Sequence, residues 1–265
     1  MAVDTRVTYL ALDALARRYR AHAAARPARD GDLTPFELRV FSQNGEDGAI
    51  EEILARIGTA EGSFVEFGVG GGGEGNCVFL ADVLGWRGLF MEGHPQLQAT
   101  LAGKYRHRPE VRTVHARVRP DTIDGLVGAA GLPAELDVLS IDVDGIDLWI
   151  WRALSAARPR LVVIEYNAGL DPAAALVQPL EPPREWDGTD FFGASLGALR
   201  RVGREKGYRL VHTDVTGVNA FFVRQDLAAP FPADEAVPVR APNYFFSGGG
   251  HPRHTGDGAY EELND

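Results

Sequence analysis

The sequence is poor in cysteine and in long apolar stretches, and each shortage excludes a class of protein. Its 265 residues include one cysteine, Cys77, which excludes an internal disulfide framework and a cysteine-rich zinc or iron–sulfur site. No apolar run approaches the ~18 to 20 residues that span a bilayer. The first residues also lack the basic, apolar and small-residue order of a signal peptide, so we expect a cytoplasmic protein.

Positive charge is also in short supply. The chain has 27 Lys and Arg residues against 37 Asp and Glu residues, a formal net charge of −10. This balance disfavours a nucleic acid or an anionic membrane as partner, so we expect a small-molecule partner and leave a homo-oligomer open. The share of hydrophobic residues, 45%, is that of an ordinary globular protein.

Short apolar segments and helical segments alternate through the middle of the chain and predict an α/β fold. Strands are expected at residues 63–67, 88–91, 111–118, 137–141 and 160–164, with helices at 49–57, 77–84, 95–105, 121–130, 148–156 and 195–206. Such alternation implies parallel strands with helices on both faces. Two further strands, 208–214 and 219–224, are joined by so few residues that they must run antiparallel.

The two ends of the chain differ from this middle part. Residues 3–25 are rich in Ala, Leu and Arg and predict a helix, while the last residues are polar and rich in glycine. We therefore divide the chain into an N-terminal helical arm, a central ligand-binding domain and a C-terminal tail or lid. The expected bounds of these parts are residues 1–40, 41–226 and 227–265.

A glycine-rich loop follows the first strand of the central domain. Gly68, Gly70 and Gly73 satisfy the pattern G-x-G-x-x-G, and Glu92 lies at the end of the next strand. Glycines allow the backbone to approach a ligand closely, and an acid at that position suits the two hydroxyls of a ribose. The pattern predicts a nucleotide-type cofactor, and it fits a nicotinamide nucleotide as well as S-adenosylmethionine.

An acid inside the first strand favours the second cofactor. Glu66 stands two residues before Gly68, which resembles motif I (E-x-G-x-G) of class I methyltransferases. In those enzymes the acid helps to orient the methionine end of the cofactor through its ammonium group or a water. The antiparallel pair near the C-terminus also resembles the methyltransferase sheet, whose last strand is inserted antiparallel.

Six segments carry a more specific resemblance. They are FSQNGEDG, FVEFGVG, LSIDVDGIDLWIW, VVIEYN, FGASLGAL and GVNAFFV, at residues 41–48, 64–70, 139–151, 162–167, 192–199 and 217–223. Together they resemble bacterial methyltransferases of the FkbM and macrocin O-methyltransferase (TylF) type. The resemblance implies a Rossmann-like class I methyltransferase fold, with a seven-stranded, mostly parallel sheet and an antiparallel last strand. It also implies S-adenosylmethionine-dependent O-methylation of a sugar or other polyhydroxylated small molecule, in natural-product or glycan biosynthesis.

Polar residues follow the fourth and fifth strands. Asp142 and Asp144 come after one strand, and Glu165 and Asn167 come after the next. Hard oxygen ligands at neighbouring strand ends suit Mg²⁺, Mn²⁺ or Ca²⁺. The metal-dependent enzymes that the chain resembles imply Asp142, Glu165 and Asn167 as ligands, with Asp144 as a fourth, although TylF has adjacent aspartates where this chain has Glu-Tyr-Asn. Alternatively, Asp144 forms a turn, Glu165 holds a substrate group without metal, and Asp147 is an N-cap or a solvated helix start.

Further residues are candidates for contact with the cofactor and for proton transfer. A methyl-accepting hydroxyl must lose its proton, and His94 and His212 are the candidate bases. Asp142 is assigned both to the cofactor and to the reacting centre, and His115 is expected near the adenine. The resemblance places Gln43 near the cofactor carboxylate. For each histidine a surface or core role stays open, and Gln43 lies in what is alternatively a capped helix start.

Two other functions stay open. A NAD(P)-dependent oxidoreductase shares the glycine pattern and Glu92, but it leaves Glu66 and the antiparallel pair unexplained. A non-catalytic S-adenosylmethionine-binding module shares the whole fold, and the acids after the fourth and fifth strands speak against it.

Overall fold

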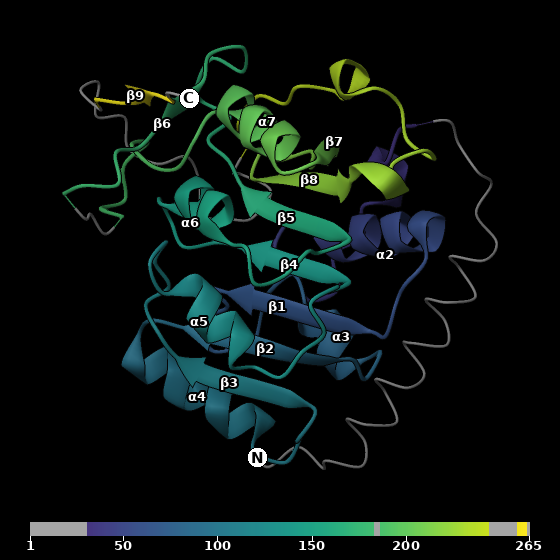
Figure 1. The fold of residues 1–265 in the computed structure, drawn as a ribbon, viewed down its shortest axis with the longest axis vertical. Helices are drawn as coiled ribbons and strands as arrows, with labels where there is room; N and C mark the ends of the chain where they lie inside the picture. The colour runs from purple at the N-terminus through teal and green to yellow at the C-terminus, as the bar shows by residue number, and fades with distance from the viewer. Residues whose placement is uncertain (1–30, 183–185, 244–258, 264–265) are drawn as a thin grey trace.

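The computed structural model describes residues 31–182, 186–243 and 259–263 (Figure 1). Within them a seven-stranded sheet has the order β3-β2-β1-β4-β5-β8-β7, seen in Figure 1 from β3 at the bottom to β7 at the top. The strands are β1 (Ser63–Phe67), β2 (Arg87–Glu92), β3 (Val111–His115), β4 (Val138–Ile141), β5 (Leu161–Glu165), β7 (Tyr208–Thr213) and β8 (Asn219–Arg224). A second, two-stranded sheet pairs β6 (Leu176–Val177) with β9 (Glu261–Glu262).

The strand directions confirm the predicted fold class. The pairs β1–β2, β2–β3, β1–β4 and β4–β5 are parallel, whereas β8 runs antiparallel to both β5 and β7. The carboxyl ends of β1, β2, β4 and β5 therefore meet at one edge of the sheet, where open α/β sheets bind ligands. Because β8 is reversed, it begins at this edge, and its first residue, Asn219, lies opposite Glu165.

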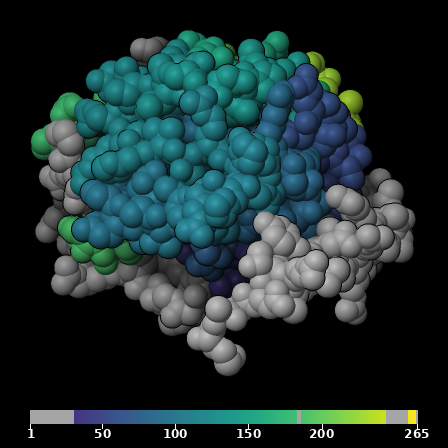
Figure 2. All heavy atoms as spheres, turned by 90° about the horizontal axis from the view of Figure 1, so that it is seen from below, coloured from purple at the N-terminus to yellow at the C-terminus, as the bar shows by residue number. Residues whose placement is uncertain are grey.

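Helices cover both faces of the sheet and enclose two separate cores. One face is covered by α2 (Glu46–Ile57), α3 (Val78–Asp82) and α4 (Pro95–Tyr105), and the other by α5 (Ile123–Gly128), α6 (Asp147–Ala153) and α7 (Leu196–Glu205). Side chains alternate along each strand, so that Phe64 enters the first core and Val65 the second. Seen from the β3 end, the described atoms form a rounded surface (Figure 2).

The long loop after β5 has more order than its sequence suggests. Residues 168–189, where the sequence predicts neither a helix nor a strand, contain β6, which pairs with β9 near the end of the chain. Ser195, which follows this loop, caps α7 by accepting a hydrogen bond from the amide of Ala198 at 3.1 Å. The capping bond accounts for the serine at that position without a role in ligand binding.

The described parts of the chain ends pack against the domain. Residues 31–40, assigned by sequence to the arm, include a short 3₁₀ helix (Thr34–Phe36) and the buried Leu33 and Phe36. In the segment assigned to a tail or lid, Phe231, Val237 and Leu263 are buried. The helix predicted at residues 3–25 lies outside the described residues. Across the described ranges, every helix is too short or too polar to cross a membrane.

Candidate active site

Two glycines of the loop after β1 have different physical reasons for being glycine. Gly68 has φ of +81°, and a Cβ there would lie 1.4 Å from the carbonyl oxygen of Asp142. Gly70 has φ of +60°, and a Cβ there would meet nothing within 4 Å. Gly68 thus permits the close approach of the ends of β1 and β4. Gly70 instead leaves open space beside the loop, as a ligand cradle requires.

Glu66 holds the far end of the same loop. It is buried, and its two carboxylate oxygens accept hydrogen bonds from the amides of Asn76 and Cys77, at 2.7 and 2.9 Å. Burial raises the pKa of Glu66 to about 7, although these amides oppose the rise. Each oxygen therefore holds one backbone amide and keeps one acceptor position, and the role implied by the resemblance, orienting the methionine end of the cofactor, stays a prediction.

Glu92 ends β2 and also binds backbone amides. One oxygen accepts from the amide of Gly70 and the other from the amide of His94, both at 2.7 Å. A carboxylate offers about four acceptor positions, so two remain after these bonds. The side chain borders a cavity of about 600 Å³, and the remaining positions suit a pair of hydroxyl donors.

Two cavities lie along the carboxyl edge of the sheet and share Gly68, Gly70 and Asp142 in their walls. The larger, of about 600 Å³, contains Glu92 and is bordered by Trp186 of the long loop. The smaller, of about 270 Å³, is lined by residues from the loop before α2, from the glycine loop and from the start of β8. Since the two share walls, they form one elongated cleft whose middle is Asp142.

The three candidate histidines do not converge on this cleft. His94 is exposed and borders the larger cavity beside Glu92. His115 lies outside the residues that line either cavity, and its Nε2 is 3.1 Å from the carbonyl oxygen of Gly93. His212 is buried, with Nε2 at 2.9 Å from Glu37, and borders a separate cavity of about 650 Å³. Only His94 is therefore within the cleft, at the end marked by Glu92.

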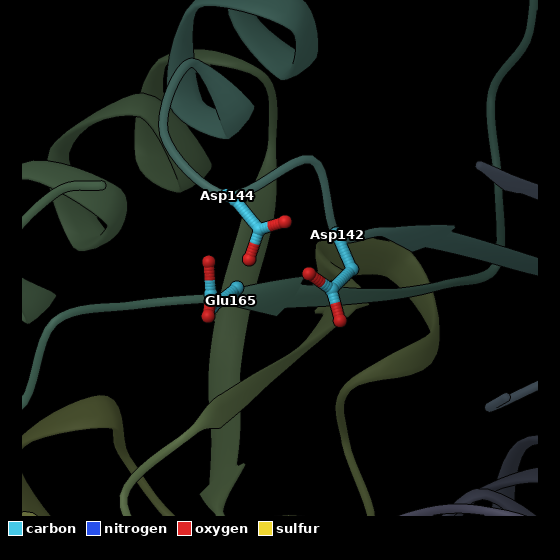
Figure 3. Close-up of side chains that lie close together, drawn as sticks. All are labelled: Asp142, Asp144 and Glu165. Carbon is cyan, nitrogen blue, oxygen red and sulfur yellow. The ribbon is translucent and has the colours of Figure 1, made fainter. Parts of the chain in front are cut away.

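Asp142, Asp144 and Glu165 come together as the sequence predicts. One oxygen from each lies within 4.8 Å of the others, and the three carboxylates face one another from the ends of β4 and β5 (Figure 3). Asp144 adopts a left-handed backbone with φ of +57°, a conformation rare for a residue other than glycine. This turn directs its carboxylate back toward Glu165.

Burial and neighbouring negative charge raise the pKa of each of the three carboxylates. Burial raises the pKa of Asp142 and of Glu165 well above the usual range, and in both cases neighbouring negative charges add to the rise. Burial is also the first cause of the raised pKa of Asp144. One oxygen of Glu165 is buried without a hydrogen-bond partner in the described chain. Such a cluster requires a proton or a cation to offset its charge.

Asn167, the remaining predicted metal ligand, is bound to the long loop. Its Nδ2 donates to the carbonyl oxygens of Asp190 and Phe192 and to the hydroxyl of Tyr260, at 2.9 to 3.1 Å. Its Oδ1 accepts from the amide of Gly169 at 2.9 Å. The side chain is used to hold the long loop, so the described ligand set consists of three acids.

Asp147 begins α6, as the sequence predicts, but it is not solvated. It is 1% exposed, and its carboxylate accepts from the amides of Val143 and Gly145 at 2.8 and 2.9 Å. These bonds fix the loop that carries Asp144. Asp147 thus positions the carboxylate cluster without belonging to it.

The cleft contains two residues to which the sequence analysis assigned no role. Glu46 and Asn219 line the smaller cavity together with Gln43, which is exposed there. Both lie inside segments that carry the family resemblance, FSQNGEDG and GVNAFFV. Their presence in those segments was a usable signal, but nothing in the chain order indicated that they meet.

Comparisons with known proteins give distant likenesses. No family model and no curated protein sequence matches the chain. Among solved structures, the fibrillarin pre-rRNA processing protein of Methanococcus jannaschii is 11% identical over 64% of this chain and 69% of that one, with a TM-score of 0.44. The N-terminal domain of EvdMO1 with SAH bound is 12% identical over 83% and 95%, also with a TM-score of 0.44. Mitomycin 7-O-methyltransferase MmcR is 15% identical over 67% and 55%, with a TM-score of 0.37.

Proposed function

We propose that this protein is an S-adenosylmethionine-dependent methyltransferase that methylates a hydroxyl oxygen of a sugar or another polyhydroxylated small molecule. The observation that carries the proposal is the cleft at the carboxyl edge of the sheet. It has a hydroxyl-binding acid, Glu92, in one cavity and passes Asp142, a member of the carboxylate cluster, at its middle. The six segments that resemble the FkbM and macrocin O-methyltransferase type support the same activity.

The residues of the cleft fit the cofactor. The open space at Gly70 adjoins Glu92, whose free acceptor positions suit the two ribose hydroxyls. Trp186 and Leu97 are largely exposed and border the same cavity, where they offer apolar surface to a purine base. The nucleoside end therefore belongs in the larger cavity and the amino-acid end in the smaller one.

Deprotonation of the acceptor is assigned to the carboxylate cluster. When bound, the cofactor supplies a methyl group on a positively charged sulfur. Asp142 lies at the middle of the cleft, and a carboxylate whose pKa is raised by burial and neighbouring charge is a better proton acceptor than an exposed one. His212 is paired with Glu37 outside the cleft, and His94 lies at the ribose end, so neither is as well placed.

The cluster also suits a divalent cation. Asp142, Asp144 and Glu165 supply hard oxygen donors that already face one another, and the unpartnered oxygen of Glu165 is available as a ligand. A bound Mg²⁺ or Mn²⁺ would lower the pKa of an acceptor hydroxyl and offset the repulsion among the three acids.

Calorimetry with S-adenosylhomocysteine and NAD in parallel tests the cofactor. We expect S-adenosylhomocysteine to bind and NAD not to bind. Glu92→Ala removes up to two charge-assisted hydrogen bonds, each worth about 1.5 to 3 kcal/mol, so affinity should fall at least tenfold. Glu110→Ala, which removes an acid paired with Arg108 away from the cleft, is the matched control and should bind normally.

Binding of NAD in place of S-adenosylhomocysteine would replace the proposal with an oxidoreductase. Methyl transfer from labelled cofactor to a panel of sugar acceptors then separates an enzyme from a binding module. Tight cofactor binding without turnover on any polyhydroxylated acceptor would favour the module.

A further inference from the structure

The smaller cavity contains an acid that the proposed function does not yet use. A cofactor with its nucleoside beside Glu92 must extend its amino-acid end past Gly68 and Asp142 into this cavity. Glu66, the acid implied by sequence to meet the ammonium group there, already accepts a backbone amide on each oxygen, which leaves one acceptor position on each. The other acid buried in the same wall is Glu46, from the first turn of α2.

Glu46 is held rigidly in that wall. It is 1% exposed, and its Oε1 accepts from Nδ2 of Asn219 at 2.8 Å and from Nδ2 of Asn44 at 3.1 Å. Its Oε2 accepts from the backbone amide of Asn44 at 2.7 Å, which leaves this oxygen one acceptor position. No Arg, Lys or His in residues 31–182, 186–243 and 259–263 forms a recorded ion pair with it. Glu46 is therefore a buried acid near an open cavity, with neutral donors around it.

Asn219 provides independent evidence for a ligand, because its side-chain oxygen has no donor among the described residues. It is 3% exposed and lines the same cavity, and its Oδ1 is buried without a hydrogen-bond partner in the described part of the chain. The orientation of the amide is fixed by chemistry, because a flip would turn Oδ1 against the carboxylate of Glu46. Buried acceptors without partners are rare in native proteins and mark a place for a ligand or an ordered water.

We propose that Glu46 and Asn219 recognise the amino group at the amino-acid end of the cofactor, an inference that rests on the proposed function. An ammonium group has three N–H donors and a positive charge. The free position on Glu46 Oε2 and the unpartnered Oδ1 of Asn219 are acceptors, and Glu46 supplies the opposite charge. Glu66 also has a structural role, since it fixes the glycine loop to the start of α3.

The test compares two ligands by calorimetry. S-adenosylhomocysteine carries the amino-acid end, and 5′-methylthioadenosine has the same thioether nucleoside without it. We expect Glu46→Gln to lower the affinity for S-adenosylhomocysteine at least tenfold and the affinity for 5′-methylthioadenosine less than twofold. Glu52→Gln makes the same charge change on the same helix, away from the cleft, and should change neither affinity.

A second measurement uses the unaltered protein, so it does not depend on the folding of a variant. Deaminated S-adenosylhomocysteine keeps the carboxylate but lacks the amino group, and we expect it to bind at least tenfold more weakly than the parent ligand. Equal affinity for the two, or an equal loss of both ligands in Glu46→Gln, would overturn the assignment and leave the methyltransferase proposal intact. Failure of the unaltered protein to bind any of the three ligands would overturn both.

Discussion

The acids on the two sides of the cleft differ in how their charge is satisfied. On the side of β1 and β2, Glu66 and Glu92 each accept two backbone amides from the glycine loop and its surroundings. On the side of β4 and β5, Asp142, Asp144 and Glu165 face one another without such donors among the described residues. The first pair is part of the architecture and keeps its geometry with or without a ligand. The cluster, in contrast, depends on a proton or a cation, as a reacting centre requires.

The largest effect is expected at the junction of the two sides. Gly68→Ala places a Cβ 1.4 Å from the carbonyl oxygen of Asp142, a backbone atom that cannot move without separating β1 from β4. Together with the left-handed φ, this should cost more than about 4 kcal/mol of the free energy of unfolding. Urea denaturation checks it. A variant of normal stability would show that the two strand ends do not need to approach so closely.

The next largest effect on stability is expected at Glu66, whose carboxylate accepts two backbone amides. Because the pKa of Glu66 is raised from 4.5 to about 7, the folded protein keeps a proton there that the unfolded chain has lost. The unfolding free energy should therefore fall as pH rises between about 4.5 and 7, by roughly 2 to 3 kcal/mol from pH 5 to pH 8. Glu66→Gln should remove this part of the pH dependence. The free energy of unfolding of both proteins is measured by denaturation at several pH values. If it depends on pH in the same way in both, the two amides already offset the effect of burial on the pKa of Glu66.

A smaller effect is expected in the carboxylate cluster. In EDTA at pH 8, Glu165→Gln removes one of three mutually repelling acids. We expect the free energy of unfolding to rise by about 1 kcal/mol, which would raise Tm by roughly 2 to 4 °C. Mg²⁺ or Mn²⁺ should raise the Tm of the unaltered protein but not that of the variant. Glu181→Gln, an exposed acid paired with Arg119, is the matched control. If neither ion changes the Tm of the unaltered protein, the cluster does not bind a divalent cation. Its function would then be to accept a proton.

At Gly70 the effect on stability is expected to be modest and the effect on ligand binding large. A Cβ there meets open space, so Gly70→Ala should lose only the roughly 1 to 2 kcal/mol of a left-handed backbone. The methyl group would instead enter the cleft beside Glu92, and we expect the affinity for S-adenosylhomocysteine to fall at least tenfold. Gly70→Ala should thus lose mainly ligand affinity, whereas Gly68→Ala should lose mainly stability. Normal affinity in a folded variant would mean that the ligand does not approach this loop.

Much of the fold followed from local patterns in the sequence. The alternation of short apolar strands with helices predicted the sheet, and the short link between residues 213 and 219 predicted the antiparallel pair. The pairing of β6 with β9 was missed, because two-residue strands distant in the chain leave no periodic signal. The acids after β4 and β5 were predicted because parallel strands bring their carboxyl ends to one edge. Three of the four predicted metal ligands do come together there.

The sequence alone determined which chemical groups follow the strands that end at the cleft, because the order of elements along the chain and the glycine positions are local properties. The tertiary structure decided which partner each group has. Asn167 donates hydrogen bonds to carbonyl oxygens 23 and 25 residues away in the long loop, and Glu66 accepts hydrogen bonds from the amides just before α3. Glu46 and Asn219 are 173 residues apart and meet only because β8 enters the sheet in reverse beside β5. Hydrogen-bond partners across such separations depend on how the whole chain closes, and no local pattern encodes them.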